Sequence, residues 1–352
     1  MYPFKEGSFA IRNGWYVAGF REDISRQPIA RTILNMPMAF YRKEDGTPVA
    51  VGGRCPHRHF PLGKSCTQGD TIVCGYHGIA FGPDGKCVNV PSQNAVPAAY
   101  RIPAYPAVDH GMWVFVWPGD AEKADTALLP DLVEIGLEGA DLTAQPISTR
   151  EVQSRYQLLN DNLLDLTHLA FLHSSSIGTI DNARQPEELT RSDGLLRSRR
   201  YIRDGEPTPS LRERQGYDGL VDSVIGMDFY LPGLHAGFGD HFVAQSAKVD
   251  PGRVLQTGRV YHAITPSTPT STYYFFGIAN SDPTFMAEAK AFLDPVLDED
   301  VFAAEEIEKM LSLVGENIPE LMLKSDRNAV EGRRMMQKWM DKEHALTCSP
   351  EM

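Results

Sequence analysis

Two short segments, each with one cysteine and one histidine, are the residues of this chain best suited to metal chemistry. Cys55-Pro56-His57 is followed by Cys74-Gly75-Tyr76-His77, with sixteen residues between His57 and Cys74. Thiolate sulfur and imidazole nitrogen are ligands that zinc and iron accept readily in proteins. We therefore expect a turn at each segment and one metal unit held between the two.

Two kinds of metal site fit these four ligands. A structural zinc ion takes them in a closed tetrahedron, whereas a Rieske [2Fe–2S] cluster has two cysteines on one iron and two histidines on the other. Zinc fingers usually pair Cys with Cys and His with His, but here each segment mixes the two, so that each can give one ligand to each iron. The spacing favours the Rieske cluster. Nearby, His59 is expected to be a loop or packing residue, and Cys66 and Cys87 ordinary small buried residues.

A second group of candidate ligands lies about a hundred residues downstream. The segment NDNLLDLTHLAFLH, residues 160–173, carries His168 and His173 among carboxylate and amide side chains. Two histidines and one carboxylate with open positions are the usual protein site for Fe(II) that activates O₂. Residues five apart on an ideal helix point about 140° away from each other. The helix must therefore distort, or end, before His173.

Both segments resemble the motifs of one family. CPHRHFPLGKSCTQGDTIVCGYHGIAFGPDGKCVNVPS is similar to the Rieske motif of ring-hydroxylating and O-demethylating oxygenases. The pattern N-x-x-D-x-x-H-x₄-H of their catalytic domains is matched by Asn162, Asp165, His168 and His173. The chain length, the order of the domains and the segment TPSTPTSTYYFFGIA resemble the vanillate O-demethylase and dicamba monooxygenase group. The resemblance covers nearly the whole chain.

The resemblance implies an enzyme and its site residues. It implies the oxygenase component of a multicomponent Rieske monooxygenase, with a mononuclear Fe(II) site besides the cluster. The family's third iron ligand is an Asp on a C-terminal helix, for which Asp300 is the best match and Asp298 and Glu299 are competitors. Asn162 and Asp165 are expected to be catalytic. The Asp165 carboxylate is expected to orient His168 and to bridge to a cluster histidine, His77, of the next subunit in a homotrimer.

The substrate and partners follow from the same resemblance. The expected reaction is O₂-dependent oxidation of a small aromatic substrate, with O-demethylation of a methoxylated aromatic acid as the best class. A ring or alkyl hydroxylase or dioxygenase of the same family is one alternative, and a non-catalytic electron-transfer or zinc-stabilised protein is another. No G-x-G-x-x-G follows a strand, so NAD(P)H electrons must come through a ferredoxin or a reductase partner.

The elements that must position these residues divide the chain. Short apolar runs separated by Gly and Pro turns predict an all-β domain over 1–120, including a strand over 31–40. Residues 121–145 look like a connector, and 146–352 form an α+β domain. The resemblance implies a helix-grip-like (START-type) fold for that domain, with an antiparallel sheet and C-terminal helices.

Within the second domain, residue spacing predicts the individual elements. Leucine spacing predicts one helix over 156–172, followed by a loop over 174–188 that could cover the site entrance. Five strands are expected next. Three histidines of the predicted sheet region, His235, His241 and His262, could reach a substrate, although a packing role is equally open for each. The last helices are expected over 284–293, 299–314 and 325–345, with a break at Pro295 and an N-cap at Ser325. Those five strands are expected over 196–203, 225–231, 241–248, 256–264 and 271–279.

The composition excludes several protein classes. The chain has 352 residues, of which 42% are hydrophobic, as in a globular protein. A net charge of −12 argues against nucleic acid or an anionic membrane as a partner, and no apolar run approaches the ~20 residues of a membrane span. The first residues lack the apolar core of a signal peptide, so we expect the cytoplasm. An odd number of cysteines, five, argues against a disulfide framework.

Overall fold

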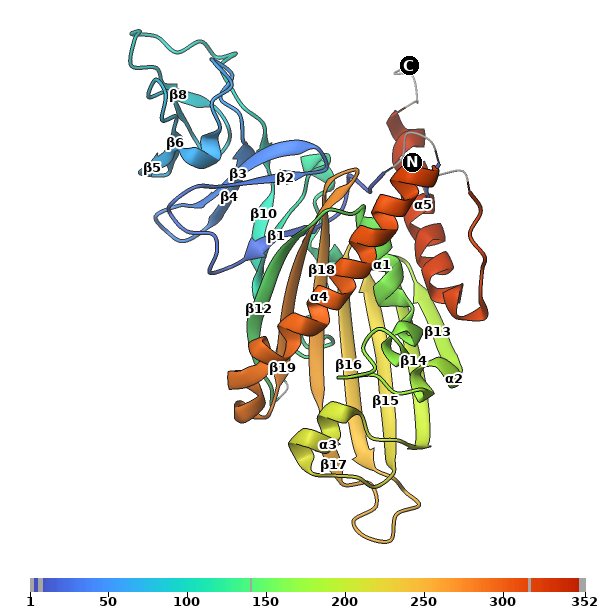
Figure 1. Ribbon diagram of the computed structural model, residues 1–352. Helices are drawn as coiled ribbons and strands as arrows, with labels where there is room; N and C mark the ends of the chain where they lie inside the picture. Colours follow the sequence, from blue (N-terminus) through green and yellow to red (C-terminus); the bar gives the residue numbers. More distant parts are fainter. Residues whose placement is uncertain (1–2, 6–8, 140, 316–317, 348–352) are drawn as a thin grey trace. The chain divides into compact units, whose positions relative to one another are not determined.

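The chain forms two compact units. A computed structural model describes all residues except 1–2, 6–8, 140, 316–317 and 348–352, so that Cys348 lies outside it (Figure 1). The N-terminal unit comprises Ala10–Leu129 together with Thr265–Pro269. The C-terminal unit comprises the described residues of Met1–Phe9, Pro130–Ile264 and Thr270–Met352. Each unit is described by itself below.

The N-terminal unit consists of small antiparallel sheets. Their strand orders are β1-β11-β10, β2-β3-β4-β9 and β5-β6-β7-β8. The all-β prediction for this part of the chain is confirmed. The strands are β1 (Tyr16–Phe20), β2 (Ile29–Ile33), β3 (Met36–Arg42), β4 (Pro48–Gly52), β5 (Cys66–Gln68), β6 (Thr71–Val73), β7 (Ala80–Phe81), β8 (Cys87–Asn89), β9 (Ala104–Tyr105), β10 (Ala107–His110) and β11 (Trp113–Val116).

One strand predicted in this unit is in fact a hairpin. The run 31–40 divides into β2 and β3, which pair with each other around Leu34 and Asn35. Both turn residues have positive φ, 51° and 62°, as a two-residue hairpin turn requires. Leucine is a poor signal for such a turn. The backbone N–H groups of Leu34 and Asn35 donate to the carbonyls of Pro266 and Ser267 (3.0 and 2.8 Å), which holds the turn in place.

The C-terminal unit is one antiparallel sheet with helices on it. The strand order is β12-β19-β18-β16-β15-β14-β13, and β17 pairs with β16. Helices α1, α4 and α5 pack over one face of the sheet (Figure 1), which confirms the predicted α+β class. The strands are β12 (Thr143–Val152), β13 (Glu187–Ser192), β14 (Leu195–Gly205), β15 (Val221–Tyr230), β16 (Leu234–Val243), β17 (Val254–Gln256), β18 (Gly258–Thr268) and β19 (Ser271–Asn280). The helices are α1 (Tyr156–Leu164), α2 (Asp181–Arg184), α3 (Pro209–Gln215), α4 (Pro283–Val314) and α5 (Arg327–Thr347).

The helix predicted over 156–172 is interrupted between the candidate ligands. Helix α1 ends at Leu164, and a 3₁₀ turn, η4 (Leu166–Ala170), follows. Asp165 lies between them outside the helical region, with φ −110° and ψ 89°, and its carboxylate accepts a hydrogen bond from the backbone N–H of Thr167 (2.9 Å). An aspartate that caps a new turn competes with continuation of the helix. The prediction that the helix ends before His173 is confirmed.

The predicted helix break at Pro295 is wrong. Helix α4 runs without interruption from Pro283 to Val314. Proline removes one backbone hydrogen bond, but the helix is held on both sides of it. One guanidinium nitrogen of Arg150 lies 3.0 Å from the carboxylates of both Asp294 and Asp298. The apolar residues that flank Pro295 are buried. Tertiary packing therefore overrides the local signal.

Three smaller differences complete the comparison with the predicted elements. The predicted loop 174–188 contains α2 and the start of β13, and β12 begins inside the predicted connector. Ser325 is not an N-cap, because it lies within a 3₁₀ turn in which the Asp326 carboxylate accepts from the backbone N–H of Leu323. None of the helices in the described ranges is both long and apolar enough to cross a membrane.

Candidate metal centres and substrate cavity

The two Cys/His segments fold into equivalent loops, which we call knuckles. In the first, the Cys55 carbonyl accepts from the N–H of His59, and the Cys55 N–H donates to the Phe60 carbonyl, both at 2.9 Å. In the second, Cys74 makes the same two bonds with Gly78 (2.9 Å) and Ile79 (2.8 Å). The backbone of each loop thus holds its cysteine from both sides.

The backbone conformation of the fourth residue after each cysteine explains the role of His59, for which the sequence predicts either a loop or a packing residue. His59 and Gly78 occupy the same position in the two knuckles, and both have positive φ, 61° and 70°. Histidine is among the few residues other than glycine that enter this region with some frequency. The exposed His59 ring contacts Arg54. His59 therefore serves the shape of the loop, as the loop reading predicts.

The four candidate cluster ligands are arranged with sulfur inside and imidazole outside. Cys55 and Cys74 are 1% and 2% exposed and belong to the apolar core of the N-terminal unit. The rings of His57 and His77 are exposed and lie with their centres 4.5 Å apart. Burial raises the pKa of the Cys55 thiol, and the adjacent Cys74 raises it further. Two neighbouring buried thiols and two neighbouring imidazoles fit the donor set of a Rieske cluster.

The other two cysteines of this region differ from expectation. Cys66 is exposed and Cys87 is half-buried, so the prediction that both are buried is wrong. Both lie on short strands, β5 and β8, of the small sheet that carries the second knuckle. These are the two outer strands of the sheet, whereas Ile72 and Phe81 on its inner strands, β6 and β7, are fully buried.

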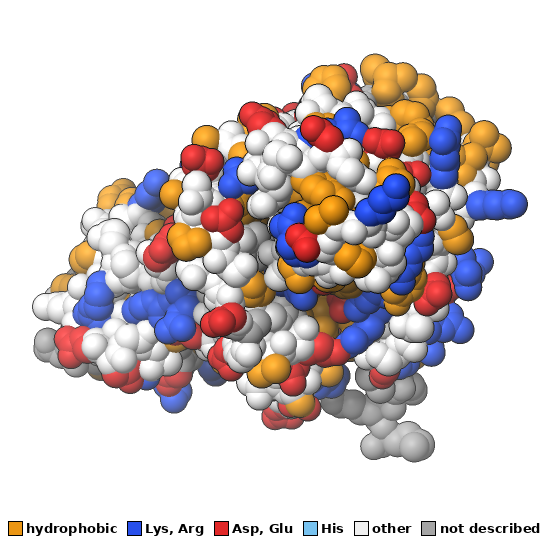
Figure 2. Space-filling view, turned by 90° about the horizontal axis from the view of Figure 1, so that it is seen from below, with side chains coloured by type: hydrophobic (Ala, Val, Ile, Leu, Met, Phe, Trp, Pro, Cys, Tyr) orange, Lys and Arg blue, Asp and Glu red, His pale blue; other side chains and the backbone are white. Residues whose placement is uncertain are grey.

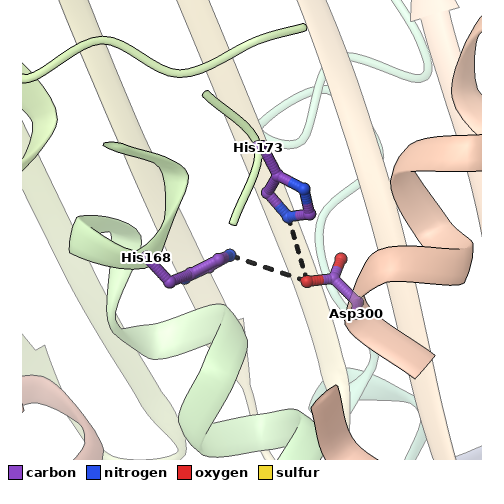
Figure 3. A group of neighbouring side chains, drawn as sticks. All are labelled: His168, His173 and Asp300. Atoms are coloured by element: carbon purple, nitrogen blue, oxygen red, sulfur yellow. Dashed lines mark hydrogen bonds and ion pairs between the residues drawn. The ribbon is translucent and has the colours of Figure 1, made fainter. Parts of the chain in front are cut away.

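The second candidate site joins three side chains from separate elements. His168 comes from η4, His173 from the loop after it, and Asp300 from the middle of α4 (Figure 3). One ligand atom from each lies within 4.8 Å of the others. Asp300 Oδ1 is 3.0 Å from His173 Nε2 and 3.7 Å from His168 Nε2. The three residues form what we call the triad.

Each triad histidine is held through its other nitrogen. Nδ1 of His168 contacts the backbone carbonyl of Asp165. Nδ1 of His173 lies 2.6 Å from a carboxylate oxygen of Glu299. Such contacts fix the proton on Nδ1 and leave the lone pair of Nε2 for a metal. The expectation that the Asp165 carboxylate orients His168 is wrong, since the backbone carbonyl of the same residue does so.

The triad has the electrostatics of a cation site. His173 is 1% exposed and has an acceptor at each ring nitrogen, Glu299 and Asp300. A neutral imidazole carries one proton and cannot satisfy both. Although burial lowers the pKa of His173, its bonds to Asp300 and Glu299 raise it overall, whereas burial lowers the pKa of His168. A metal ion between the Nε2 atoms and Asp300 would resolve this conflict.

The remaining predicted site residues are close to the triad. The Asn162 side-chain N–H donates to Asp300 Oδ1 at 3.2 Å, while its buried Oδ1 has no partner among the described residues. Of the acids that compete with Asp300, Glu299 binds the far side of His173 and Asp298 pairs with Arg150. The sequence gives no signal for the role of Glu299, because it depends on how α4 lies against the loop.

A buried ion pair fixes α4 relative to α1. Arg155, which precedes α1, binds Glu308 of α4 through Nε and Nη2, both at 2.7 Å, and through its backbone N–H at 3.1 Å. The two side chains are 5% and 7% exposed. Because Asp300 lies two turns before Glu308, this pair helps to set the position of Asp300 opposite the histidines.

A cavity of about 230 Å³ lies beside the triad, inside the C-terminal unit. Its floor is the face of β15, β16, β18 and β19 that α4 covers, and its lining is mainly apolar. Ile177, Thr179 and Asn182, from the region predicted to cover the entrance, also line it.

Two of the three histidines predicted in the sheet, His241 and His262, are lining residues of this cavity. His235 is not one of them. Its ring stacks on Phe229 with centres 4.3 Å apart, and its Nε2–H donates to Asn160 Oδ1 at 2.8 Å. His262 lies opposite Tyr274, whose hydroxyl is 2.5 Å from its Nδ1, and burial lowers the pKa of His262 to about 4.

Comparison with known proteins identifies matches for both units. Residues 14–106 match the Rieske [2Fe-2S] domain family, and residues 152–342 match the vanillate O-demethylase oxygenase C-terminal domain family. Together these matches cover both the knuckles and the triad.

Full-length relatives agree with the domain matches. The chain is 31% identical to the dicamba O-demethylase oxygenase component of Stenotrophomonas maltophilia, over 93% of this chain and 97% of that protein. It is 30% identical to a vanillate O-demethylase oxygenase subunit of a Pseudomonas species, over 93% and 94%. The crystal structure of dicamba monooxygenase bound to dicamba superposes with a TM-score of 0.86 at 30% identity, over 96% and 100% of the two chains.

Proposed function

The chain belongs to the Rieske non-haem iron oxygenases, as the oxygenase component of a monooxygenase of the vanillate O-demethylase group, and from this we propose that it O-demethylates a methoxylated aromatic acid. The observation that carries the proposal is the triad beside a mainly apolar cavity, in a chain that also has the two knuckles. Two of the relatives above are named as O-demethylases. The alternative of a bare electron carrier finds no support, because such a protein needs neither triad nor cavity.

The same proposal assigns the metal ligands. Cys55, His57, Cys74 and His77 would hold the [2Fe–2S] cluster, and His168, His173 and Asp300 would hold Fe(II). When bound, the cluster supplies single electrons and the ferrous ion supplies O₂ activation. Three protein ligands on one side of a metal leave positions open on the other.

The protein's own side chains do the positioning. With a metal ion bound, Glu299 and the Asp165 carbonyl would hold the protons on Nδ1 of the two histidines and leave both Nε2 atoms free for the metal. Asn162 restrains one Asp300 oxygen, and its free Oδ1 can accept a hydrogen bond from a water or hydroxyl at the triad. The apolar lining excludes water from the reacting carbon. The neutral His262, backed by Tyr274, can bond a carboxylate or phenol of a ring placed there.

The proposal includes a homotrimer in which Asp165 joins neighbouring subunits. Its carboxylate is half-buried, and the nearby Phe171 is 70% exposed, an unusual place for a large apolar ring unless another surface covers it. A carboxylate there can accept a hydrogen bond from the exposed ring of His77 of an adjacent copy. Such outer carboxylates tune both the tautomer and the potential of a metal-bound histidine.

External electron donors complete the proposal. The enzyme would take electrons that originate from NAD(P)H through a ferredoxin, a reductase or both. The four described cysteines form no disulfide, which suits work in the reducing cytoplasm.

A product screen tests the proposed reaction. The purified protein, analysed to hold three irons and two sulfides per chain, is mixed with a surrogate ferredoxin and reductase and with methoxylated aromatic acids. Formaldehyde and the matching phenol are expected in equal amounts, and both should disappear in His168→Ala. A hydroxylated product that keeps its methoxy group, without formaldehyde, would refute demethylation and favour a hydroxylase.

A further inference from the structure

The cavity is much longer than a single substituted ring. Its lining includes Asp300 of α4 and His262 of β18 near the triad, and it also includes Phe285 of α4 and His241 of β16, which lie farther from the triad along these elements. Fifteen residues of helix from 285 to 300 rise ~22 Å. His262 pairs with His235, six residues before His241 on β16, which corresponds to ~20 Å of strand. Lining residues on two independent elements therefore extend over about the same distance, which is longer than a methoxybenzoate.

The end far from the triad, which we call the distal end, carries a polar pair that the proposed reaction does not use. Ser223 and His241 are directly opposite each other on β15 and β16, and Ser223 Oγ lies 2.7 Å from His241 Nδ1. Ser223 is 4% exposed. Both residues line the cavity. The hydroxyl thus fixes the plane of the imidazole ring.

The second nitrogen of His241 lies beside another residue that lines the cavity. Nε2 lies over Gly239, another lining residue, 3.5 Å from the place where a Cβ would stand. Among the described residues the structure gives this nitrogen no hydrogen-bond partner. Depending on which ring nitrogen carries the proton, Nε2 can either donate or accept. It therefore suits an amide, carbonyl or hydroxyl.

The charges at the distal end indicate that the substrate group bound by His241 is neutral. Arg259 lines the cavity but lies 3.0 Å from Asp240, and Arg214 stacks on Phe285 and lies 3.4 Å from Glu288. Figure 2 views the molecule from the end that carries α3 and β17, and shows acidic and basic side chains next to one another there. Burial also lowers the pKa of His241, which keeps the ring uncharged at neutral pH. Among the described residues that line the distal end, both arginines thus already have a carboxylate partner.

We propose that the substrate has two parts, a methoxylated ring at the triad and an extension that ends in a neutral hydrogen-bonding group on His241. This refines the substrate class and rests on the proposed function for the reacting end. His241 is then a specificity-determining residue, and Ser223 is a positioning residue that acts through it.

A matched pair of probes isolates the contact. One probe is a methoxyphenyl ring joined by a chain of six methylene groups to a primary carboxamide, and the other has an isopropyl group in place of the carboxamide. Binding to the holoenzyme is measured by calorimetry, and turnover by formaldehyde release. We expect the wild type to prefer the carboxamide about 5- to 10-fold, the usual net value of one hydrogen bond.

The variants decide the outcome. His241→Ala should erase the preference for the carboxamide probe without weakening the binding or turnover of methoxybenzoate. Ser223→Ala should reduce this preference, and His241→Gln should retain part of it. An unchanged cluster spectrum and melting temperature show that the variants fold. A preference that survives His241→Ala overturns the proposal, as does an equal loss for methoxybenzoate and both long probes, which would make His241 part of the entry path only. If no compound yields formaldehyde but the His241-dependent preference persists, the demethylation is refuted and this inference stands.

Discussion

The knuckles of the N-terminal unit and the triad of the C-terminal unit differ in how far along the chain their residues lie. The four knuckle ligands lie between positions 55 and 77, and each cysteine is held by backbone bonds within its own loop. The triad spans positions 168 to 300, and its acid reaches the histidines only because α4 packs against α1. The first site is a local structure, and the second is a product of tertiary packing.

This difference has an energetic consequence. A local loop can keep its geometry when distant contacts weaken, since its hydrogen bonds close over four or five residues. The triad instead depends on every interaction that fixes α4, including the buried pair of Arg155 and Glu308. Changes to the packing should therefore damage the triad and leave the cluster intact.

Removal of a triad ligand should give the largest effect. His168→Ala takes away one of the three proposed metal ligands. The Lewis-acid contribution of a catalytic metal is several kcal/mol, so turnover should fall on the order of 10³-fold or more. The visible spectrum of the cluster should persist, because the knuckles lie in the other unit. Formaldehyde release and absorption spectra are measured on the same sample.

The exposed His344 of α5 offers a matched control for that experiment. His344→Ala should retain both activity and spectrum. If His168→Ala instead bleached the cluster, the separation of the two sites would be mistaken.

Loss of the buried ion pair between Arg155 and Glu308 should have the second-largest effect. Glu308→Ala leaves Arg155 charged, buried and without its carboxylate, which typically costs about 3–5 kcal/mol. For a unit of this size that corresponds to a fall in melting temperature of roughly 10 °C. Iron at the triad should be lost before the cluster spectrum changes. Glu306→Ala, on the exposed side of the same helix, should change stability by less than about 0.5 kcal/mol, and an equal effect of both variants would contradict the argument.

The same contrast explains what could be predicted from sequence. The knuckles were identified from residue spacing, because the ligands, the turns and the left-handed positions all lie within one short segment. His168 and His173 were found through a motif, and Asp300 could be ranked above Asp298 and Glu299 only by resemblance. Which acid meets the histidines depends on the rotation of α4, and neither Pro295 nor the local pattern encodes that rotation.

The features that the sequence predicted wrongly or did not predict also have physical causes. The helix over 156–172 was predicted as one piece because leucine spacing continues through Asp165, while the capping bond to Thr167 that interrupts it is a local competitor. The contact between Ser223 and His241 at the distal end could not be predicted from the sequence. Its two residues meet across a strand register that the sequence does not specify.

Neutralisation of Asp165 should have an intermediate effect that links the two sites. Asp165→Asn preserves the cap on Thr167, because an asparagine side chain accepts the same hydrogen bond. It also leaves the carbonyl contact to His168 unchanged. Both metals should remain, and turnover should slow by about 10- to 100-fold, the usual range for an outer-shell carboxylate. Rapid-mixing oxidation of the reduced enzyme measures the step, with substrate affinity as the control. Wild-type rates would exclude the bridge between subunits.

The smallest effects should separate the two equivalent positions of the knuckles. Gly78→Ala places a Cβ at φ 70° and 3.0 Å from the Pro91 ring, so it should destabilise the N-terminal unit by about 1–2 kcal/mol. His59→Gly relieves the same backbone strain but adds freedom to the unfolded chain, so the two contributions should nearly cancel, to within about 0.5 kcal/mol. Denaturant titrations followed through the cluster spectrum measure both. A cluster that fails to assemble in His59→Gly would show that this imidazole does more than shape its loop, and the equivalence of the knuckles would then be incomplete.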